Sequence, residues 1–151
     1  MSDELPTSLN VHGTAVMVSG KGLLLCGPSG AGKSDLALRL IEAGASLISD
    51  DRTLLRRDGE AILASAPESI SGMIEVRGLG LVHLPCLSEA RLSAVIDLVS
   101  EAEMERLPLP ETSEFMGITL PLYRLSGLAA SSVAKVRLIA GSFAHCEVIA
   151  V

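Results

Sequence analysis

Residues 27–34 read GPSGAGKS and match the whole pattern of a phosphate-binding loop, G-x-x-x-x-G-K-[ST]. The glycines allow backbone angles that aim consecutive N–H groups at an anion. Lys33 reaches the β- and γ-phosphates, and the hydroxyl of Ser34 is a ligand for Mg²⁺. The pattern therefore predicts a site for ATP with Mg²⁺. The expected nucleotide-binding residues are Gly27, Pro28, Ser29, Gly30, Ala31, Gly32, Lys33, Ser34 and Asp35.

A phosphate loop needs a carboxylate nearby, and two places in the chain offer one. Asp50 and Asp51 end the apolar run ASLIS, one helix after the loop. Asp97 lies in the run AVIDLV, which fits a generic Walker B pattern but continues with apolar residues. A strand that follows the first helix commonly lies beside the phosphate-loop strand, so its carboxyl end opens beside the phosphates. We expect the aspartate pair to serve the site, with Asp97 as the alternative.

Two adjacent carboxylates repel each other, so at a strand end they are either solvated in a turn or held by a cation. A bound Mg²⁺ would supply that cation. One carboxylate then binds the metal, and the other accepts a proton from an incoming hydroxyl group and later returns it. Asp50 and Asp51 therefore predict phosphoryl transfer to a hydroxyl, although coupled carboxylates can exchange these roles.

Other polar residues are weaker candidates by themselves. Glu75 and Arg77 are two residues apart, so on a strand both would face the same side. Arg77 could clamp a phosphate with two hydrogen bonds, and an ordinary surface ion pair is the alternative. A single histidine such as His12 more often has a structural role. Three isolated cysteines, at positions 26, 86 and 146, fit buried free thiols better than a zinc site or a disulfide framework.

The elements that must position these residues do not alternate regularly. A hairpin is expected over residues 13–27, followed by a helix over 33–44 with apolar residues at helical spacing. The order predicts an α/β fold in which a strand–loop–helix unit sits in a mixed β-sheet. Further on, we expect a strand at 46–49, a hairpin over 52–65, strands at 78–84 and 92–99, a loop over 105–115, a strand at 117–125 and a C-terminal helix over 128–141.

Composition limits the classes of function. The 151 residues suit one domain, expected at residues 11–151 after a tail at 1–10. Aromatic residues make up 2% and the net charge is −6, which disfavours binding to nucleic acid or acidic membranes. No apolar run approaches the ~18 residues of a membrane span, and the polar N-terminus is no signal peptide. We expect a cytoplasmic protein.

The order of motifs resembles the catalytic domain of HPr kinase/phosphorylase. NVHG at 10–13 precedes the phosphate loop, ISDDR follows one helix later, and IEVRGLGLVHL occupies 74–84. The resemblance implies a P-loop domain similar to phosphoenolpyruvate carboxykinase. It also implies an enzyme that uses Mg²⁺ and ATP or pyrophosphate to phosphorylate a serine of the phosphocarrier protein HPr. The family also removes that phosphate by attack of inorganic phosphate, which yields pyrophosphate.

The resemblance also implies roles for individual residues. Asp50 is similar to the general base of the family, His12 to its histidine near the phosphates, and Arg77 lies in the signature linked to dephosphorylation. The metal ligands implied are Ser34, Asp51 and Glu75. The chain resembles short forms that consist of the catalytic domain alone. It departs from the late arginine-bearing loop of the family, where it reads LPLYRLSG with Arg124. Dephosphorylation and the homo-oligomeric assembly of the family therefore stay open.

Two other functions fit a phosphate loop. A small-molecule kinase usually has an arginine-bearing lid, and residues 100–115 contain a single arginine, Arg106. A non-catalytic nucleotide sensor would bind ATP without forming a phosphorylated product. The combination of the phosphate loop, Asp50–Asp51 and EVRGLG favours the protein kinase.

Overall fold

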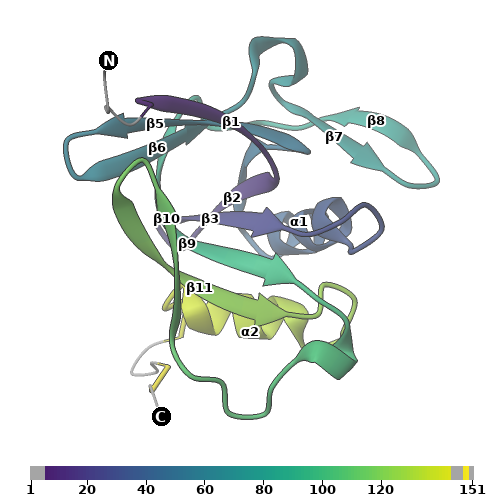
Figure 1. Cartoon of the computed structure of the whole chain (residues 1–151). Coiled ribbons are helices and arrows are strands. Elements are labelled where there is room, and N and C mark those ends of the chain that lie inside the picture. Colours follow the sequence, from purple (N-terminus) through teal and green to yellow (C-terminus); the bar gives the residue numbers. More distant parts are fainter. Residues whose placement is uncertain (1–5, 144–147, 150–151) are drawn as a thin grey trace.

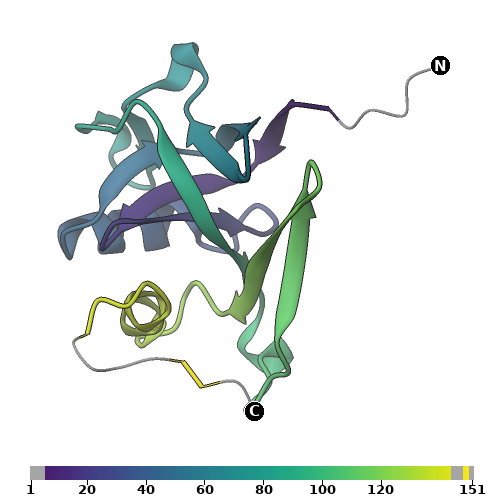
Figure 2. The same cartoon turned by 90° about the vertical axis from the view of Figure 1, so that its left-hand side faces the viewer.

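The computed structural model describes residues 6–143, 148 and 149, which form a mixed sheet with α1 and α2 on one face (Figures 1 and 2). The first half contains β1 (Ser8–His12), β2 (Thr14–Val18), β3 (Lys21–Cys26), α1 (Lys33–Glu42), β4 (Ser46–Ser49), β5 (Arg52–Asp58) and β6 (Ala61–Ser65). The second half contains η1 (Glu68–Ile70), β7 (Met73–Val76), β8 (Gly80–His83), β9 (Ala90–Leu98), η2 (Glu101–Glu103), β10 (Glu111–Phe115), β11 (Ile118–Leu125) and α2 (Ser132–Ile139).

Strand β9 connects the parts of the sheet. It runs parallel to β3 and to β11, and its first residues pair antiparallel with β6. The path β1-β5-β6 leads away from β9 in one direction, and β3-β2-β4 leads away in the other. β10 pairs with β11, while β7 and β8 form a separate two-stranded hairpin. The fold is thus α/β with a mixed sheet, a phosphate-loop helix and a C-terminal helix, as predicted.

Strand β4 does not lie beside the phosphate-loop strand β3, so that expectation was wrong. β2 lies between them and pairs antiparallel with both, with Thr14 opposite Leu25 and Ala15 opposite Ser49. Because the β2–β3 hairpin precedes the loop, β2 takes the edge of β3 that β4 would otherwise use. Two antiparallel steps make β3 and β4 parallel, so their carboxyl ends still open on the same side of the sheet.

Alternation along the central strands separates two cores. Val16 of β2 and both Leu23 and Leu25 of β3 are buried against the helices, where they meet Leu36 of α1. Leu24 points the other way and packs in the second core, which also contains residues of β5, β6 and β9. A period of two in the strands therefore produces one helix-covered face and one strand-covered face.

Several boundaries differ from the sequence expectation, and the strand β7 was not expected. β1 begins at Ser8, inside the segment expected as a tail, because it pairs along its whole length with β5. β10 occupies the end of the expected loop 105–115, since Met116 and Gly117 adopt positive φ and turn the chain back into β11. The C-terminal helix is shorter than predicted, at Ser132–Ile139.

Two further expectations concern thiols and membranes. Cys26 and Cys86 are free thiols, but both are only partly buried, and Cys146 lies outside the described residues. Within the described part of the chain, no helix has the length and apolar character needed to cross a membrane.

Candidate active site

The phosphate loop joins β3 to the N-terminus of α1. Gly27, Gly30 and Gly32 adopt φ values of 144°, 85° and 93°, which side chains other than glycine rarely tolerate. A Cβ on Gly32 would also lie 2.8 Å from Cδ2 of Leu128, an exposed side chain that would have to move to accommodate it. The loop thus has the geometry that its glycines predicted, with the positive end of the α1 dipole behind it.

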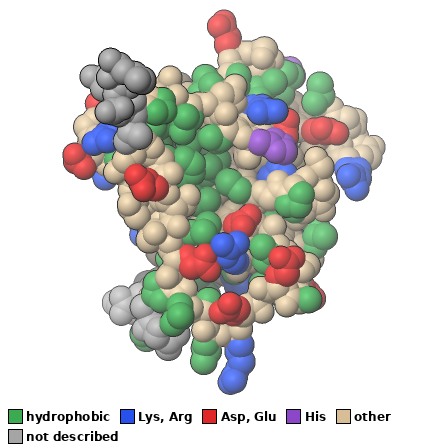
Figure 3. Space-filling model, in the orientation of Figure 1, with side chains coloured by type: hydrophobic (Ala, Val, Ile, Leu, Met, Phe, Trp, Pro, Cys, Tyr) green, Lys and Arg blue, Asp and Glu red, His purple; other side chains and the backbone are tan. Residues whose placement is uncertain are grey.

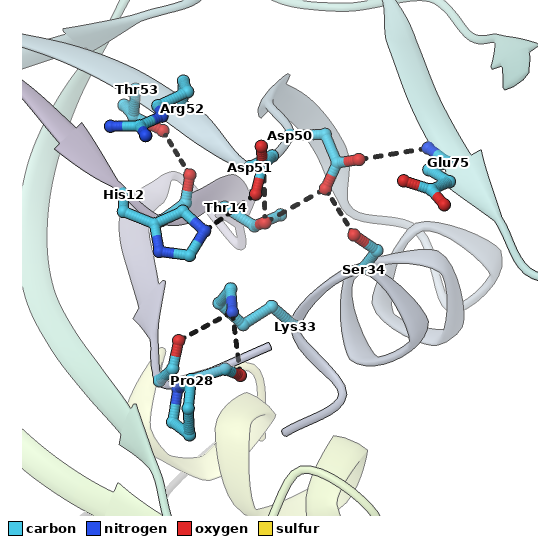
Figure 4. Close-up of polar contacts among 12 residues, drawn as sticks. His12, Thr14, Pro28, Lys33, Ser34, Asp50, Asp51, Arg52, Thr53 and Glu75 are labelled. Atoms are coloured by element: carbon cyan, nitrogen blue, oxygen red, sulfur yellow. Dashed lines mark hydrogen bonds and ion pairs between the residues drawn. The ribbon is translucent and has the colours of Figure 1, made fainter. Parts of the chain in front are cut away.

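Lys33 lies in the hollow of this loop and is 8% exposed. Its Nζ atom donates hydrogen bonds to the carbonyl oxygens of Gly27, at 2.7 Å, and Pro28, at 3.1 Å (Figure 4). The cation is therefore held at the start of α1, where anions are favoured. Asp35 of the expected nucleotide-binding set instead pairs with Arg39, 3.0 Å away on the same helix.

Asp50 is buried at the end of β4, with 6% of its surface exposed. Its Oδ1 atom accepts hydrogen bonds from Ser34 Oγ, at 2.6 Å, and Thr14 Oγ1, at 3.0 Å. Its Oδ2 atom accepts a hydrogen bond from the backbone N–H of Glu75, at 3.0 Å (Figure 4). Three donors from β2, α1 and β7 hold this carboxylate, which joins the phosphate loop to the β7–β8 hairpin.

Asp51 has a different environment from its neighbour. Its φ of 65° places it in the left-handed region, which turns its side chain away from Asp50. The side chain is 65% exposed, and Oδ1 lies 2.8 Å from Nε2 of His12. Because His12 pairs with Arg52 across β1 and β5, the strand register itself brings the histidine to the aspartate.

Thr14 contacts both aspartates and was not among the residues expected at the site. Its fully buried hydroxyl donates to Asp50 and accepts a hydrogen bond, at 3.1 Å, from the backbone N–H of Asp51. One side chain thus ties both aspartates to β2. The available signal was a lone polar residue at the start of the otherwise apolar run TAVMV, two positions after His12.

We predict that Thr14→Val lowers the free energy of unfolding by about 1–3 kcal/mol, because the buried N–H of Asp51 loses its acceptor and Asp50 loses a donor. Urea denaturation followed by circular dichroism measures the change. Thr112→Val, at an exposed position of β10, is the matched control and should stay within about 0.5 kcal/mol of the unsubstituted chain. Equal stability of the two variants would contradict the bridging role.

Glu75 and Arg77 do not share one face of a strand, contrary to expectation. β7 ends at Val76, and Arg77 lies in the tight turn that leads into β8. Both side chains are exposed, and Glu75 contacts Asp50 through its backbone N–H. The structure therefore brings Glu75 to the aspartates and places Arg77 at the tip of the β7–β8 hairpin.

Asp97 lies beside the phosphate loop, since it pairs with Cys26 at the end of β3. Its carboxylate accepts a hydrogen bond from Arg124, at 2.8 Å, and Arg124 also binds Glu111 of β10, at 2.9 Å. The alternative carboxylate is therefore held in an ion pair on the β9 side of the loop. The late arginine lies there too, on β11, and the strands β9, β3 and β2 separate it from the end of β4.

Cys26 immediately precedes the loop, and burial raises the pKa of its thiol from the ordinary 9.0 to about 11. The nearby charge of Asp97 raises this pKa further, while Lys33 lowers it. The thiol is therefore protonated at neutral pH, and the positive charge near the loop is not neutralised by a thiolate.

The raised pKa of Cys26 predicts slow alkylation. At pH 8 the thiolate fraction should be about 100-fold lower in the folded than in the unfolded chain, given the two pKa values. Since burial also restricts access, the pH profile is the sharper readout. The iodoacetamide rate at Cys26, followed by mass spectrometry, should reach half of its maximum near pH 9 in urea but only near pH 11 in the folded protein. Identical profiles would contradict the prediction.

The chemistry of these donors fits a Mg²⁺ site. Ser34 donates its proton to Asp50, so the oxygen lone pairs of its hydroxyl face away from the carboxylate and can bind a metal. No group of three or more His, Cys, Asp or Glu side chains is placed to hold a metal among residues 6–143, 148 and 149. Mg²⁺ usually takes one or two protein ligands and completes its shell with phosphate oxygens and water.

Comparisons with known proteins show the family of this chain. Residues 3–136 match the family described as HPr Serine kinase C-terminal domain. The chain is 35% identical over 137 residues to an HPr kinase/phosphorylase of Prosthecochloris aestuarii, covering 83% of the chain and 40% of that protein. It is 38% identical over 133 residues to the enzyme of the same name from Geobacillus thermodenitrificans, covering 80% of the chain and 43% of that protein.

A solved structure shares the fold. The HPr(Ser) kinase/phosphatase from Coxiella burnetii superposes with a TM-score of 0.80 and 23% sequence identity, covering 89% of this chain and 95% of that one. The curated relatives are longer, and the chain spans less than half of their length.

Proposed function

The chain belongs to the family of HPr serine kinase C-terminal domains, and we propose that it transfers the γ-phosphoryl group of ATP to a serine of HPr. HPr kinase/phosphorylases that resemble it over more than 130 residues give the proposal its substrate. The proposal places the reaction in the cytoplasm, where free thiols such as Cys26 stay reduced.

The observation that carries the proposal is the hydrogen bond from Ser34 to Asp50. In P-loop enzymes, the loop hydroxyl binds Mg²⁺ and an aspartate on a nearby strand supports it. Ser34 would hold Mg²⁺ here, and the metal would supply positive charge against the negative charge that develops during transfer. Lys33 supplies a second positive charge from inside the loop.

Asp51 is the residue we propose as proton acceptor. Its exposed carboxylate can meet a hydroxyl that arrives on another protein, and His12 orients one of its oxygens. Asp50 is buried and already accepts three hydrogen bonds, which suits it to hold Ser34. This proposal reverses the two roles that the family resemblance implied for the aspartates.

We also propose roles for two residues of the β7–β8 hairpin, Glu75 and Arg77. Glu75 presents its carboxylate beside Asp50 and Ser34, where it can contribute to metal binding (Figure 4). Arg77, at the hairpin tip, is placed to meet a phosphate on an incoming protein with two hydrogen bonds. Its exposure fits contact with a partner better than contact with the nucleotide.

The test is a phosphorylation assay with the purified chain, Mg-ATP and HPr. Mass spectrometry should find one phosphoserine on HPr, and the Lys33→Ala variant should produce none. A reverse assay with phosphorylated HPr and inorganic phosphate measures release of pyrophosphate. A folded chain that binds ATP but leaves HPr unmodified would overturn the proposal and favour a nucleotide sensor or a small-molecule kinase.

A further inference from the structure

A groove of about 890 Å³ runs along the first half of the phosphate loop. Its walls are the loop residues 28–31, the segment that follows β9 and the segment that follows β11. Acidic and basic side chains gather near the ends of these strands on the face shown in Figure 3. The proposed transfer chemistry does not use this groove.

The sheet topology places this groove at a common position for ligands in α/β folds. β3, β9 and β11 are parallel, so their carboxyl ends meet at one edge of the sheet (Figure 1). Ligands of open α/β sheets bind in the crevice outside these ends. The phosphate loop follows β3, residues 98–103 follow β9, and residues 126–128 follow β11. The groove is therefore the part of this crevice on the β9 side of the loop.

In the proposed function, the reacting phosphate lies on the opposite side of the loop. Asp50 and Asp51 follow β4, which lies beyond β2 on the other edge of β3. A triphosphate whose γ-phosphate points toward them must direct its remaining part away from them. We infer that the groove binds the base and ribose of the nucleotide, an inference that rests on the proposed function. Its volume lies within the range of roughly 300–1,000 Å³ of small-molecule sites.

Arg124 gives the groove a flat surface for a base. Its guanidinium group is held by Asp97 on one side, at 2.8 Å, and by Glu111 on the other, at 2.9 Å. A planar guanidinium stacks on aromatic rings, and two carboxylates fix its plane before the ligand arrives. The groove lining contains Arg124 but no tyrosine or phenylalanine, and the chain has no tryptophan, so an arginine rather than an aromatic residue supplies the stacking surface.

The remaining lining suits a nucleoside as well. Ala31 and Leu128 form an apolar wall beside the loop, and Leu128 is 68% exposed. Glu101 and Ser100 line the other side with oxygen atoms that can accept hydrogen bonds from ribose hydroxyls or an exocyclic amino group. A groove with apolar walls and a few polar groups is the usual composition of a small-molecule site.

The test compares a nucleotide with the same phosphate chain lacking a nucleoside. Isothermal titration calorimetry measures the dissociation constants of Mg-ATP and Mg-tripolyphosphate for the unsubstituted chain and for Asp97→Asn/Arg124→Gln. This double variant removes one positive and one negative charge, so the net charge is unchanged, and Glu111, which loses Arg124, lies at an exposed position of β10. We expect Mg-ATP to bind about tenfold or more weakly, and Mg-tripolyphosphate to change less than about twofold.

The matched control is Arg56→Gln/Glu89→Gln, which removes another exposed ion pair, 2.7 Å long, between β5 and the residue before β9, and should change neither constant. If Asp97→Asn/Arg124→Gln bound both ligands more weakly by the same factor, or bound both with unchanged dissociation constants, the inference would be overturned. If the unsubstituted chain bound neither ligand, the proposed function itself would fail.

Hydrogen–deuterium exchange of the unsubstituted chain tests the inference without any variant. Mg-ATP should protect residues 98–103 and 126–128 together with the phosphate loop. Mg-tripolyphosphate should protect the loop alone. The same protection by both ligands would overturn the placement of the nucleoside even if the double variant failed to fold.

Discussion

Replacing Asp51 with asparagine should slow phosphoryl transfer to HPr at least about 10²-fold, while the dissociation constant of Mg-ATP changes less than about twofold. An amide of the same shape cannot accept the serine proton. Asparagine tolerates the left-handed backbone of Asp51, with its φ of 65°, so the variant keeps the local fold. Single-turnover assays at saturating ATP measure the chemical step directly.

The control for Asp51→Asn is Asp58→Asn, which removes another exposed carboxylate at the end of β5 and should leave the rate unchanged. His12→Gln should slow transfer less than Asp51→Asn does, because a hydrogen bond to the carboxylate can be retained. If Asp51→Asn kept full activity while Asp50→Asn lost transfer with normal nucleotide binding, the roles implied by the family resemblance would be correct.

Asp50→Asn should act on the metal rather than on the proton. An asparagine amide facing Ser34 would donate a hydrogen bond to its hydroxyl, so the hydroxyl proton would turn toward the metal position. We expect the Mg²⁺-dependent part of ATP affinity to fall about tenfold or more, since a charge-assisted contact is lost. The free energy of unfolding should fall by about 2–3 kcal/mol, because Asp50 is buried and holds three donors.

Titrations of ATP with and without Mg²⁺ separate this effect from a general loss of binding. Ser34→Ala is the companion variant and should show the same loss of Mg²⁺ dependence with a smaller loss of stability, because it leaves Thr14 and Glu75 bound to Asp50. An Asp50→Asn variant that bound Mg-ATP normally would contradict the supporting role of the carboxylate.

The backbone geometry of the phosphate loop could be predicted because the pattern that requires it is local. The loop needs glycines, a lysine and a serine at fixed spacing, and the neighbouring strand and helix are visible in the hydrophobic pattern. The aspartate pair could be predicted for a similar reason, since charged residues that end an apolar run lie at the edge of a sheet. In the structure Asp50 lies at this edge and accepts a hydrogen bond from Ser34.

Other features depend on contacts that no local pattern records. The position of β2 between β3 and β4 results from competition among strands for the edges of β3. The bridging role of Thr14 depends on that position, so it was not visible beforehand. The different environments of Asp50 and Asp51 depend on the left-handed φ at Asp51, and the turn at Arg77 depends on where β7 ends.

The sheet order also constrains when the site can form during synthesis. The phosphate-loop strand β3 meets its parallel neighbour only when β9 has left the ribosome, because Gly22 pairs with Leu92 and Cys26 with Asp97. Non-local pairing of this kind slows folding and leaves apolar strand edges open until late. A nascent chain that ends before β9 should therefore bind no ATP and should recruit chaperones, although its phosphate loop is already complete in sequence.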